Sequence, residues 1–170
     1  AAAARVLNIS PAMVSKRLSR LERRLGVTVQ TSWGMTELSP AGPFAPPGLA
    51  DRPASSSGRP AIGIDLLLTD ADGVALSEQR EVEGHLRVRG AAVVERYFGQ
   101  AEPATDAAGW FATGDLARIG RDGSLTITGR AKDLIKSGGE WINPAEIEGV
   151  VGALPQVSMA AVIGRSDIKW

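Results

Sequence analysis

Residues 109–140 read GWFATGDLARIGRDGSLTITGRAKDLIKSGGE, and they carry the clearest strand signals in the sequence. Residues 110–119 and 124–128 are rich in apolar and β-branched side chains, which favour extended backbone. Asp122-Gly123 lies between them and is a common turn pair in β-hairpins. The stretch therefore predicts a β-hairpin.

Two oppositely charged side chains stand out in the same stretch. Asp115 follows Thr-Gly in the first expected strand, and Arg130 follows a glycine at the end of the second. A carboxylate and a guanidinium near strand ends can together bind a hydroxylated, negatively charged ligand such as a nucleotide. For each of the two, an ordinary surface ion pair is the alternative reading.

The chain before this hairpin contains further strand signals separated by turns. Residues 62–68, 83–89 and 92–97 have strand-like composition, and residues 70–73 form a turn signal with Asp and Gly. Residues 41–60 are dominated by Gly, Pro and Ser, which predicts a linker with little to pack. We therefore expect a β-rich subdomain that begins after the linker.

The composition is that of a globular chain, with 44% hydrophobic and 22% charged residues among 170. The sequence has no cysteine and one histidine, which excludes a disulfide framework, a thiolate nucleophile and a zinc site built on Cys or His clusters. It also lacks an apolar run of the roughly 18 to 20 residues that a membrane span needs. We expect a cytoplasmic protein.

Residues 1–30 differ in charge from the rest of the chain. Six of the 19 basic residues and one of the 19 acidic residues lie there, so 13 basic and 18 acidic residues follow. Residues 1–7 are helix formers, and Ser10-Pro11 is a helix-start signal. A second helix would then run to a stop at Gly26, with an apolar stripe of Val14, Leu18, Leu21 and Leu25. One interpretation is a basic amphipathic helix that is solvated on one face.

The spacing of residues 2–15, 20–22 and 25–27 resembles the helix-turn-helix of LysR-type transcriptional regulators. The resemblance implies a recognition helix in the major groove, with cations on the phosphates. Its candidate DNA-contact residues are Ser10, Met13, Ser15, Lys16, Arg17 and Arg20. Because the family's preceding helix and following wing are missing, we do not expect DNA binding by residues 1–29 alone.

Four motifs, two of them within the stretch quoted above, occur in one order along the chain. They lie at residues 33–37 (WGMTE), 109–115, 129–140 and 143–148. Their order and residues resemble the adenylate-forming acyl-CoA synthetases, specifically the medium- and long-chain fatty-acid ligases with a Trp-Gly-Met-Thr-Glu signature. The resemblance covers residues 30–170. Taken alone, the first motif would read equally well as a loop with one exposed Trp.

The resemblance assigns the first motif to the nucleotide. Trp33 and Gly34 would pack along the adenine and the acyl-adenylate. Thr36 would contact the phosphate, and Glu37 would ligate Mg²⁺. These types fit such roles, because a glycine lets the backbone approach a flat ligand and a carboxylate can hold Mg²⁺.

The later motifs are assigned to the ribose, a hinge and CoA. Asp115 would hold the ribose hydroxyls, and Arg130 would contact the ribose and phosphate side. Lys132 would lie at the hinge about which the small C-terminal domain rotates. Thr36, Glu37 and Lys132 would form the catalytic set, and the loop facing the CoA tunnel would be Ser137, Gly138, Gly139 and Glu140.

Residues 143–146 read Asn-Pro-Ala-Glu, which also has a purely structural reading as a helix start. The expected helix covers residues 144–154, ends at the following proline and precedes a strand over residues 157–163. Its buried stripe would be Ile147, Val150 and Val151.

We therefore expect an α+β chain in three parts. Residues 1–29 would be partial helix-turn-helix-like helices. Residues 30–131 would be the distal part of an AMP-binding large domain with a β-rich, barrel-like subdomain. Residues 132–170 would be the start of a small, truncated α+β C-terminal domain.

The resemblance implies a fragment of an ATP-dependent fatty-acid–CoA ligase, with ATP, Mg²⁺ and CoA as cofactors and fatty acid and CoA as substrates. The family's phosphate loop and C-terminal lysine are missing, so we expect this chain alone to catalyse neither adenylation nor thioester formation. Two alternatives stay open. One is a DNA-binding regulator fused to a nucleotide- or acyl-CoA-binding remnant, and the other is a β-rich interaction module without a ligand.

Overall fold

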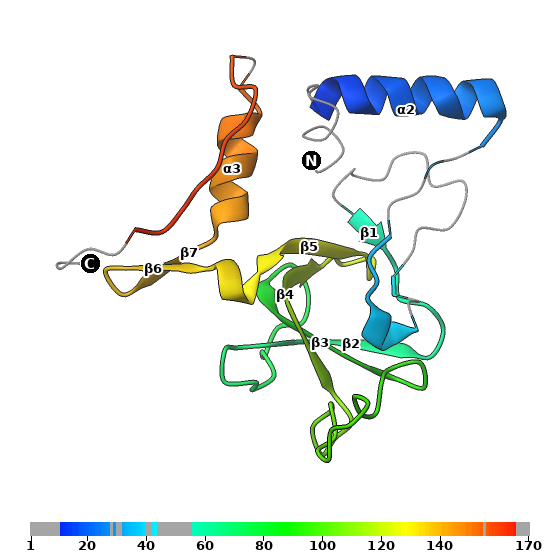
Figure 1. The fold of residues 1–170 in the computed structure, drawn as a ribbon, viewed down its shortest axis with the longest axis vertical. Coiled ribbons are helices and arrows are strands. Elements are labelled where there is room, and N and C mark those ends of the chain that lie inside the picture. The colour runs from blue at the N-terminus through cyan, green and yellow to red at the C-terminus, as the bar shows by residue number, and fades with distance from the viewer. Residues whose placement is uncertain are drawn as a thin grey trace. The chain divides into compact units, whose positions relative to one another are not determined.

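The structure is a computed structural model that describes residues 11–27, 29, 32–39, 42–43, 56–154 and 156–165 (Figure 1). These residues form a mostly antiparallel sheet with few helices. The chain divides into two compact units, residues 31–133 and residues 1–30 together with 134–170. The helix expected over residues 1–7 lies outside the described residues.

A five-stranded antiparallel sheet forms the centre of the unit of residues 31–133 (Figure 1). In sheet order its strands are β1 (Ser56–Gly58), β5 (Leu125–Arg130), β4 (Phe111–Ile119), β3 (Glu83–Gly90) and β2 (Ile64–Thr69). Within the described residues β1 and β2 are the two edges, so the sheet is open. The expectation of a barrel-like subdomain is therefore corrected.

The hairpin predicted from residues 110–128 is present and joins β4 to β5. In its turn, Asp122 Oδ1 accepts hydrogen bonds from the amide and hydroxyl of Ser124, at 3.0 and 2.7 Å. A register shift further along the ladder brings Asp115 opposite Arg130. The two charged residues singled out in the sequence are therefore cross-strand neighbours.

The core of this unit contains alternate side chains of the sheet. In β3, Leu86 and Val88 are buried while Arg89 is exposed, as expected for a strand with one buried face. Leu38, from the 3-10 helix η1 (Thr36–Leu38), is fully buried in the same cluster. Burial of a Leu side chain stabilises a fold by about 1.5–3 kcal/mol. The contact of Leu38 with the core therefore holds η1 against the sheet.

Residues 92–97, predicted as a strand, form turns and bends instead. Val93 and Val94 do pack against the core, so the apolar pattern correctly indicated burial. The amide of Val94, however, donates to the Glu37 carbonyl at 2.7 Å and not to a neighbouring strand. Local composition does not specify which carbonyl a backbone amide will bind. The amide of Val94 binds the Glu37 carbonyl, and this segment is therefore not part of the sheet.

Residues 41–60, predicted as a linker with little to pack, are structured in two places. Gly42 and Pro43 are buried, and β1 pairs with β5 near the end of the range. A side chain at Gly42 would overlap the carbonyl group of Trp33. The Gly-rich composition therefore includes one position where close packing requires glycine.

The described part of the other unit contains a hairpin and two helices. Strands β6 (Ile135–Ser137) and β7 (Glu140–Ile142) pair through the turn Gly138-Gly139, where both residues have positive φ. The helices are α2 (Pro11–Leu25) and α3 (Pro144–Gly152). The start of α3 is as predicted, because Asn143 Oδ1 accepts a hydrogen bond from the amide of Ala145 at 3.1 Å.

Three expectations for this unit are wrong. The stripe of α3 is not buried, because Ile147, Val150 and Val151 are exposed, and the α3 helix ends at Gly152. Residues 157–163 form no strand, and the amide of Val162 donates to the Glu148 carboxylate at 3.0 Å. An apolar stripe shows which face of a helix is suited to packing, but does not show that a partner lies against it.

Candidate functional site

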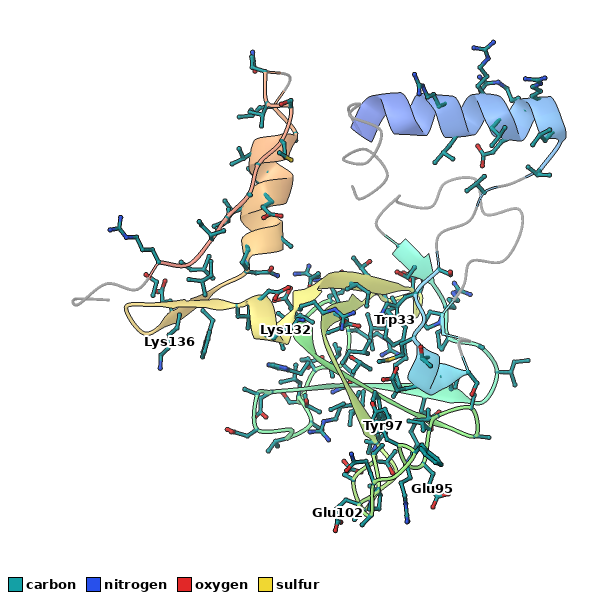
Figure 2. The ribbon with its side chains drawn as sticks, in the orientation of Figure 1. Trp33, Glu95, Tyr97, Glu102, Lys132 and Lys136 are labelled. Atoms are coloured by element: carbon teal, nitrogen blue, oxygen red, sulfur yellow. The ribbon has the colours of Figure 1, made fainter. Side chains whose placement is uncertain are left out.

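Two side chains from other parts of the sequence, Trp33 and Arg130, contact the carboxylate of Asp115. Trp33 Nε1 donates a hydrogen bond to Asp115 Oδ2 at 2.9 Å, and Arg130 Nε lies 2.8 Å from Asp115 Oδ1. The indole of Trp33 packs against the sheet (Figure 2). We call Trp33, Asp115 and Arg130 the carboxylate triad.

The strand β4 determines the position of Asp115. Thr113, two residues earlier and buried, donates from its hydroxyl to the Leu86 carbonyl at 2.9 Å and accepts from the Asp115 amide at 3.1 Å. Asp115 has only 3% of its side chain exposed, whereas its partner Arg130 is 53% exposed. The carboxylate is therefore held rigidly, while the guanidinium faces solvent.

Burial dominates the electrostatics of the triad. It raises the pKa of the Asp115 carboxyl above its ordinary value, although the Trp33 hydrogen bond and the Arg130 charge both act to lower it. Each carboxylate oxygen already has one donor, and a carboxylate offers about four lone-pair sites. Two of these lone-pair sites are therefore not used by Trp33 or Arg130.

A second carboxylate, Glu37, lies in η1 of the same unit. Its carbonyl accepts from the Val94 amide at 2.7 Å, and its Oε1 accepts from the Tyr97 hydroxyl at 2.9 Å. The neighbouring Ser39 hydroxyl donates to the Ala92 carbonyl at 3.1 Å. The loop after β3, which carries Tyr97 (Figure 2), thus makes three hydrogen bonds to η1 and the residue that follows it.

The profile of the AMP-binding enzyme family matches residues 3–98, which is more than half of the chain. The chain belongs to the AMP-binding enzyme family. The match includes α2, so the comparisons give no support to the LysR resemblance of that segment.

The chain is similar to curated CoA ligases. It is 44% identical to the medium-chain-fatty-acid–CoA ligase of Ectopseudomonas oleovorans, covering 85% of this chain and 28% of the relative. It is 41% identical to the 3-methylmercaptopropionyl-CoA ligase of Ruegeria pomeroyi, covering 90% and 30%. The chain therefore spans about 30% of the length of these relatives.

Among solved structures, the chain is similar to an O-succinylbenzoate–CoA synthetase from Bacillus subtilis in complex with ATP and magnesium ion. The TM-score is 0.70 at 34% identity, covering 86% of this chain and 31% of the other. Together these comparisons show that the chain is similar to part of adenylate-forming CoA ligases, in agreement with the coarser part of the sequence-based expectation.

The remaining expected site residues are distributed over both units. Gly34 and Thr36 are exposed beside Trp33 and Glu37 in the sequence. Lys132 is exposed in the 3-10 helix η2 (Ala131–Asp133), two residues after Arg130 (Figure 2). The four residues proposed to face CoA lie in the other unit, where Ser137 pairs with Glu140 across Gly138 and Gly139.

The candidate DNA-contact residues are described only in part. Arg17 and Arg20 are exposed on α2. Ser10 lies outside the described residues, as do the side chains of Met13, Ser15 and Lys16. The apolar residues of α2 that should be packed in a helix-turn-helix, Leu18, Leu21 and Leu25, are exposed.

Sequence reasoning missed two residues of the site. Thr113 supports Asp115, and a signal existed, because residues two apart on a strand share a face. Tyr97 reaches Glu37 across 60 residues of sequence, and the strand predicted over residues 92–97 gave no reason to connect them. The only hint was that the chain has a single tyrosine.

Neither a membrane span nor a protein-only metal site is present among the described residues. No helix there is long and apolar enough to cross a bilayer. No group of three or more His, Cys, Asp or Glu side chains there could hold a metal ion.

Proposed function

We propose that this chain supplies the ribose-binding and Mg²⁺-binding side chains of an adenylate-forming acyl-CoA ligase. The observation that carries the proposal is the carboxylate triad, in which a buried carboxylate is held by one indole and one guanidinium. In this proposal Asp115 accepts hydrogen bonds from the ribose hydroxyls. Arg130 contacts the ribose and phosphate side, and the Trp33 ring lies along the adenine.

The proposed ribose acceptor is rigid. Asp115 is positioned by the β4 ladder, by Thr113 and by both triad partners, so little side-chain entropy is lost when a ligand binds. A charged acceptor also makes stronger hydrogen bonds to hydroxyl groups than a neutral one does. The exposed Arg130 adds a positive charge on the side where a phosphate would lie.

The donor set near Glu37 fits a magnesium ion that is shared with phosphates. Mg²⁺ prefers oxygen ligands and is usually held by one or two carboxylates together with substrate phosphates and water. Glu37 offers one carboxylate, and the described residues contain no larger acidic cluster that could hold the ion alone. When bound, Mg²⁺ would neutralise phosphate charge, and Glu37 would hold it while Thr36 contacts the phosphate.

The proposed parent reaction has two steps. A carboxylate and ATP give an acyl-adenylate and pyrophosphate, and the CoA thiol then displaces AMP to give the acyl-CoA. We propose a fatty acid as the acid, supported by 44% identity to a medium-chain fatty-acid ligase. Lys132 would act at the hinge between the two steps, and Ser137, Gly138, Gly139 and Glu140 would face CoA.

Calorimetry with an acyl-sulfamate adenosine, in which a sulfamate replaces the acyl phosphate, tests the proposal. We expect the full chain to bind, and binding to be lost in Asp115→Ala and strongly weakened in Arg130→Ala. Asp65→Ala is the matched control, because it removes an exposed carboxylate paired with Arg89 on the same sheet. Absence of heat in the wild-type chain, or equal loss in the control, would reject the proposed function.

A further inference from the structure

Glu37 is held from three directions before any ligand is present. The next residue, Leu38, is fully buried in the core. The Glu37 carbonyl accepts a hydrogen bond from the Val94 amide at 2.7 Å. Its side chain is held by Tyr97, whose hydroxyl donates to Oε1 at 2.9 Å. The backbone is therefore fixed by the core, while among the described side chains the carboxylate is held by the Tyr97 phenol.

Tyr97 is not explained by packing alone. It is 46% exposed, and the next residue, Phe98, is fully exposed at the same loop. If Tyr97 contributed only to folding, its exposed hydroxyl would not need a carboxylate as its acceptor. The loop that carries it is instead bound to η1 by the Val94 and Ser39 hydrogen bonds, which brings the phenol to Glu37.

We propose that Tyr97 is a positioning residue for Glu37, holding Oε1 so that the other carboxylate oxygen is presented to the cation that accompanies the nucleotide phosphates. This inference rests on the proposed function of Glu37 and adds a residue that the sequence motifs do not contain. A free Glu side chain has substantial rotamer entropy, which is lost when it binds a ligand. A hydrogen bond formed in advance removes part of that loss, so the cation binds more tightly.

The inference distinguishes Tyr97 from a merely structural residue. If the phenol acts through Glu37, its removal weakens ATP binding only when Mg²⁺ is present. If it only stabilises the loop, ATP binding changes equally with and without Mg²⁺. The effect must also depend on Glu37, because Tyr97 has no role once the carboxylate is gone.

The test is calorimetric titration of the full chain with ATP, with and without Mg²⁺, for the wild type, Tyr97→Phe, Glu37→Gln and the double variant. We expect Mg²⁺ to tighten ATP binding in the wild type and to have no effect in Glu37→Gln. In Tyr97→Phe the tightening should fall by roughly threefold to tenfold, the range for one hydrogen bond. The double variant should match Glu37→Gln, and ATP binding without Mg²⁺ should be the same in all four.

Phe98→Ala is the matched control for disturbance of the loop, since it changes the exposed neighbour and leaves the phenol in place. It should behave as the wild type. A wild-type response to Mg²⁺ that Glu37→Gln abolishes but Tyr97→Phe leaves intact would overturn the inference and leave the proposed function standing. A wild type whose ATP binding ignores Mg²⁺ would overturn both the inference and the proposed role of Glu37.

Discussion

Asp115 and Glu37 are two carboxylates of the same unit that are held in different ways. Asp115 is buried on a central strand between two side-chain donors, whereas Glu37 lies in a short 3-10 helix at the surface with one phenol donor. Burial couples the first carboxylate to folding, because its removal leaves the partly buried Trp33 Nε1 without its acceptor. The second can be changed with little effect on the core. The site therefore has two parts. One is Asp115 and its partners on the sheet, which is rigid, and the other is Glu37 and Tyr97, on η1 and the loop after β3, which can be altered independently.

The largest effect should come from Asp115→Ala. Trp33 Nε1 would lose its acceptor and Arg130 its partner, so we expect the free energy of unfolding to fall by about 1–3 kcal/mol. Urea denaturation measures it. Glu37→Ala should change stability by less than about 0.5 kcal/mol, as for most surface substitutions. Equal losses in the two variants would remove the contrast between the carboxylates.

Trp33→Phe should have the next largest effect, because it keeps an aromatic ring but removes the donor to Asp115. We expect a loss of about 1 kcal/mol in the free energy of unfolding and weaker binding of the acyl-sulfamate adenosine. Trp110→Phe is the control, since that indole contacts the Arg89 guanidinium, which lies 4.5 Å from the centre of the ring. If the two variants bind the analogue equally well, the indole donor has no part in the site.

The pH dependence of stability should reveal the burial of the Asp115 carboxyl. The pKa of Asp115 is raised in the folded chain, so the folded state binds its proton more tightly than the unfolded state. Its contribution to stability is therefore complete below the ordinary Asp pKa and is lost as the pH rises through the folded value. Unfolding measured across this acidic window should show the loss in the wild type and not in Asp115→Asn. A constant difference between the two chains would contradict this.

The smallest expected effect is spectroscopic. The hydrogen bond to Glu37 is the main cause that raises the pKa of Tyr97, with burial and the Glu37 charge adding to it. Tyr97 is the only tyrosine, so near-ultraviolet absorbance reports its ionisation directly. Glu37→Gln should lower this pKa toward that of free tyrosine. An unchanged titration would show that the phenol does not contact the carboxylate in solution.

The sequence predicted the contacts of Asp115 on the sheet better than the contact between Glu37 and Tyr97. The Asp-Gly turn signal places β4 and β5 in one hairpin, and Asp115 and Arg130 become neighbours through this local pairing. The contact from Trp33 spans 82 residues, and no local pattern specifies such a pairing. The contact between Glu37 and Tyr97 was missed because residues 92–97 have strand composition, whereas their hydrogen bonds go to η1.

The most direct test of the central claim is a crystal structure of this chain with the acyl-sulfamate adenosine bound. We expect both ribose hydroxyls within about 3.2 Å of the Asp115 carboxylate oxygens, with Trp33 and Arg130 still in contact with that carboxylate. An analogue bound with its ribose away from Asp115 would contradict the account.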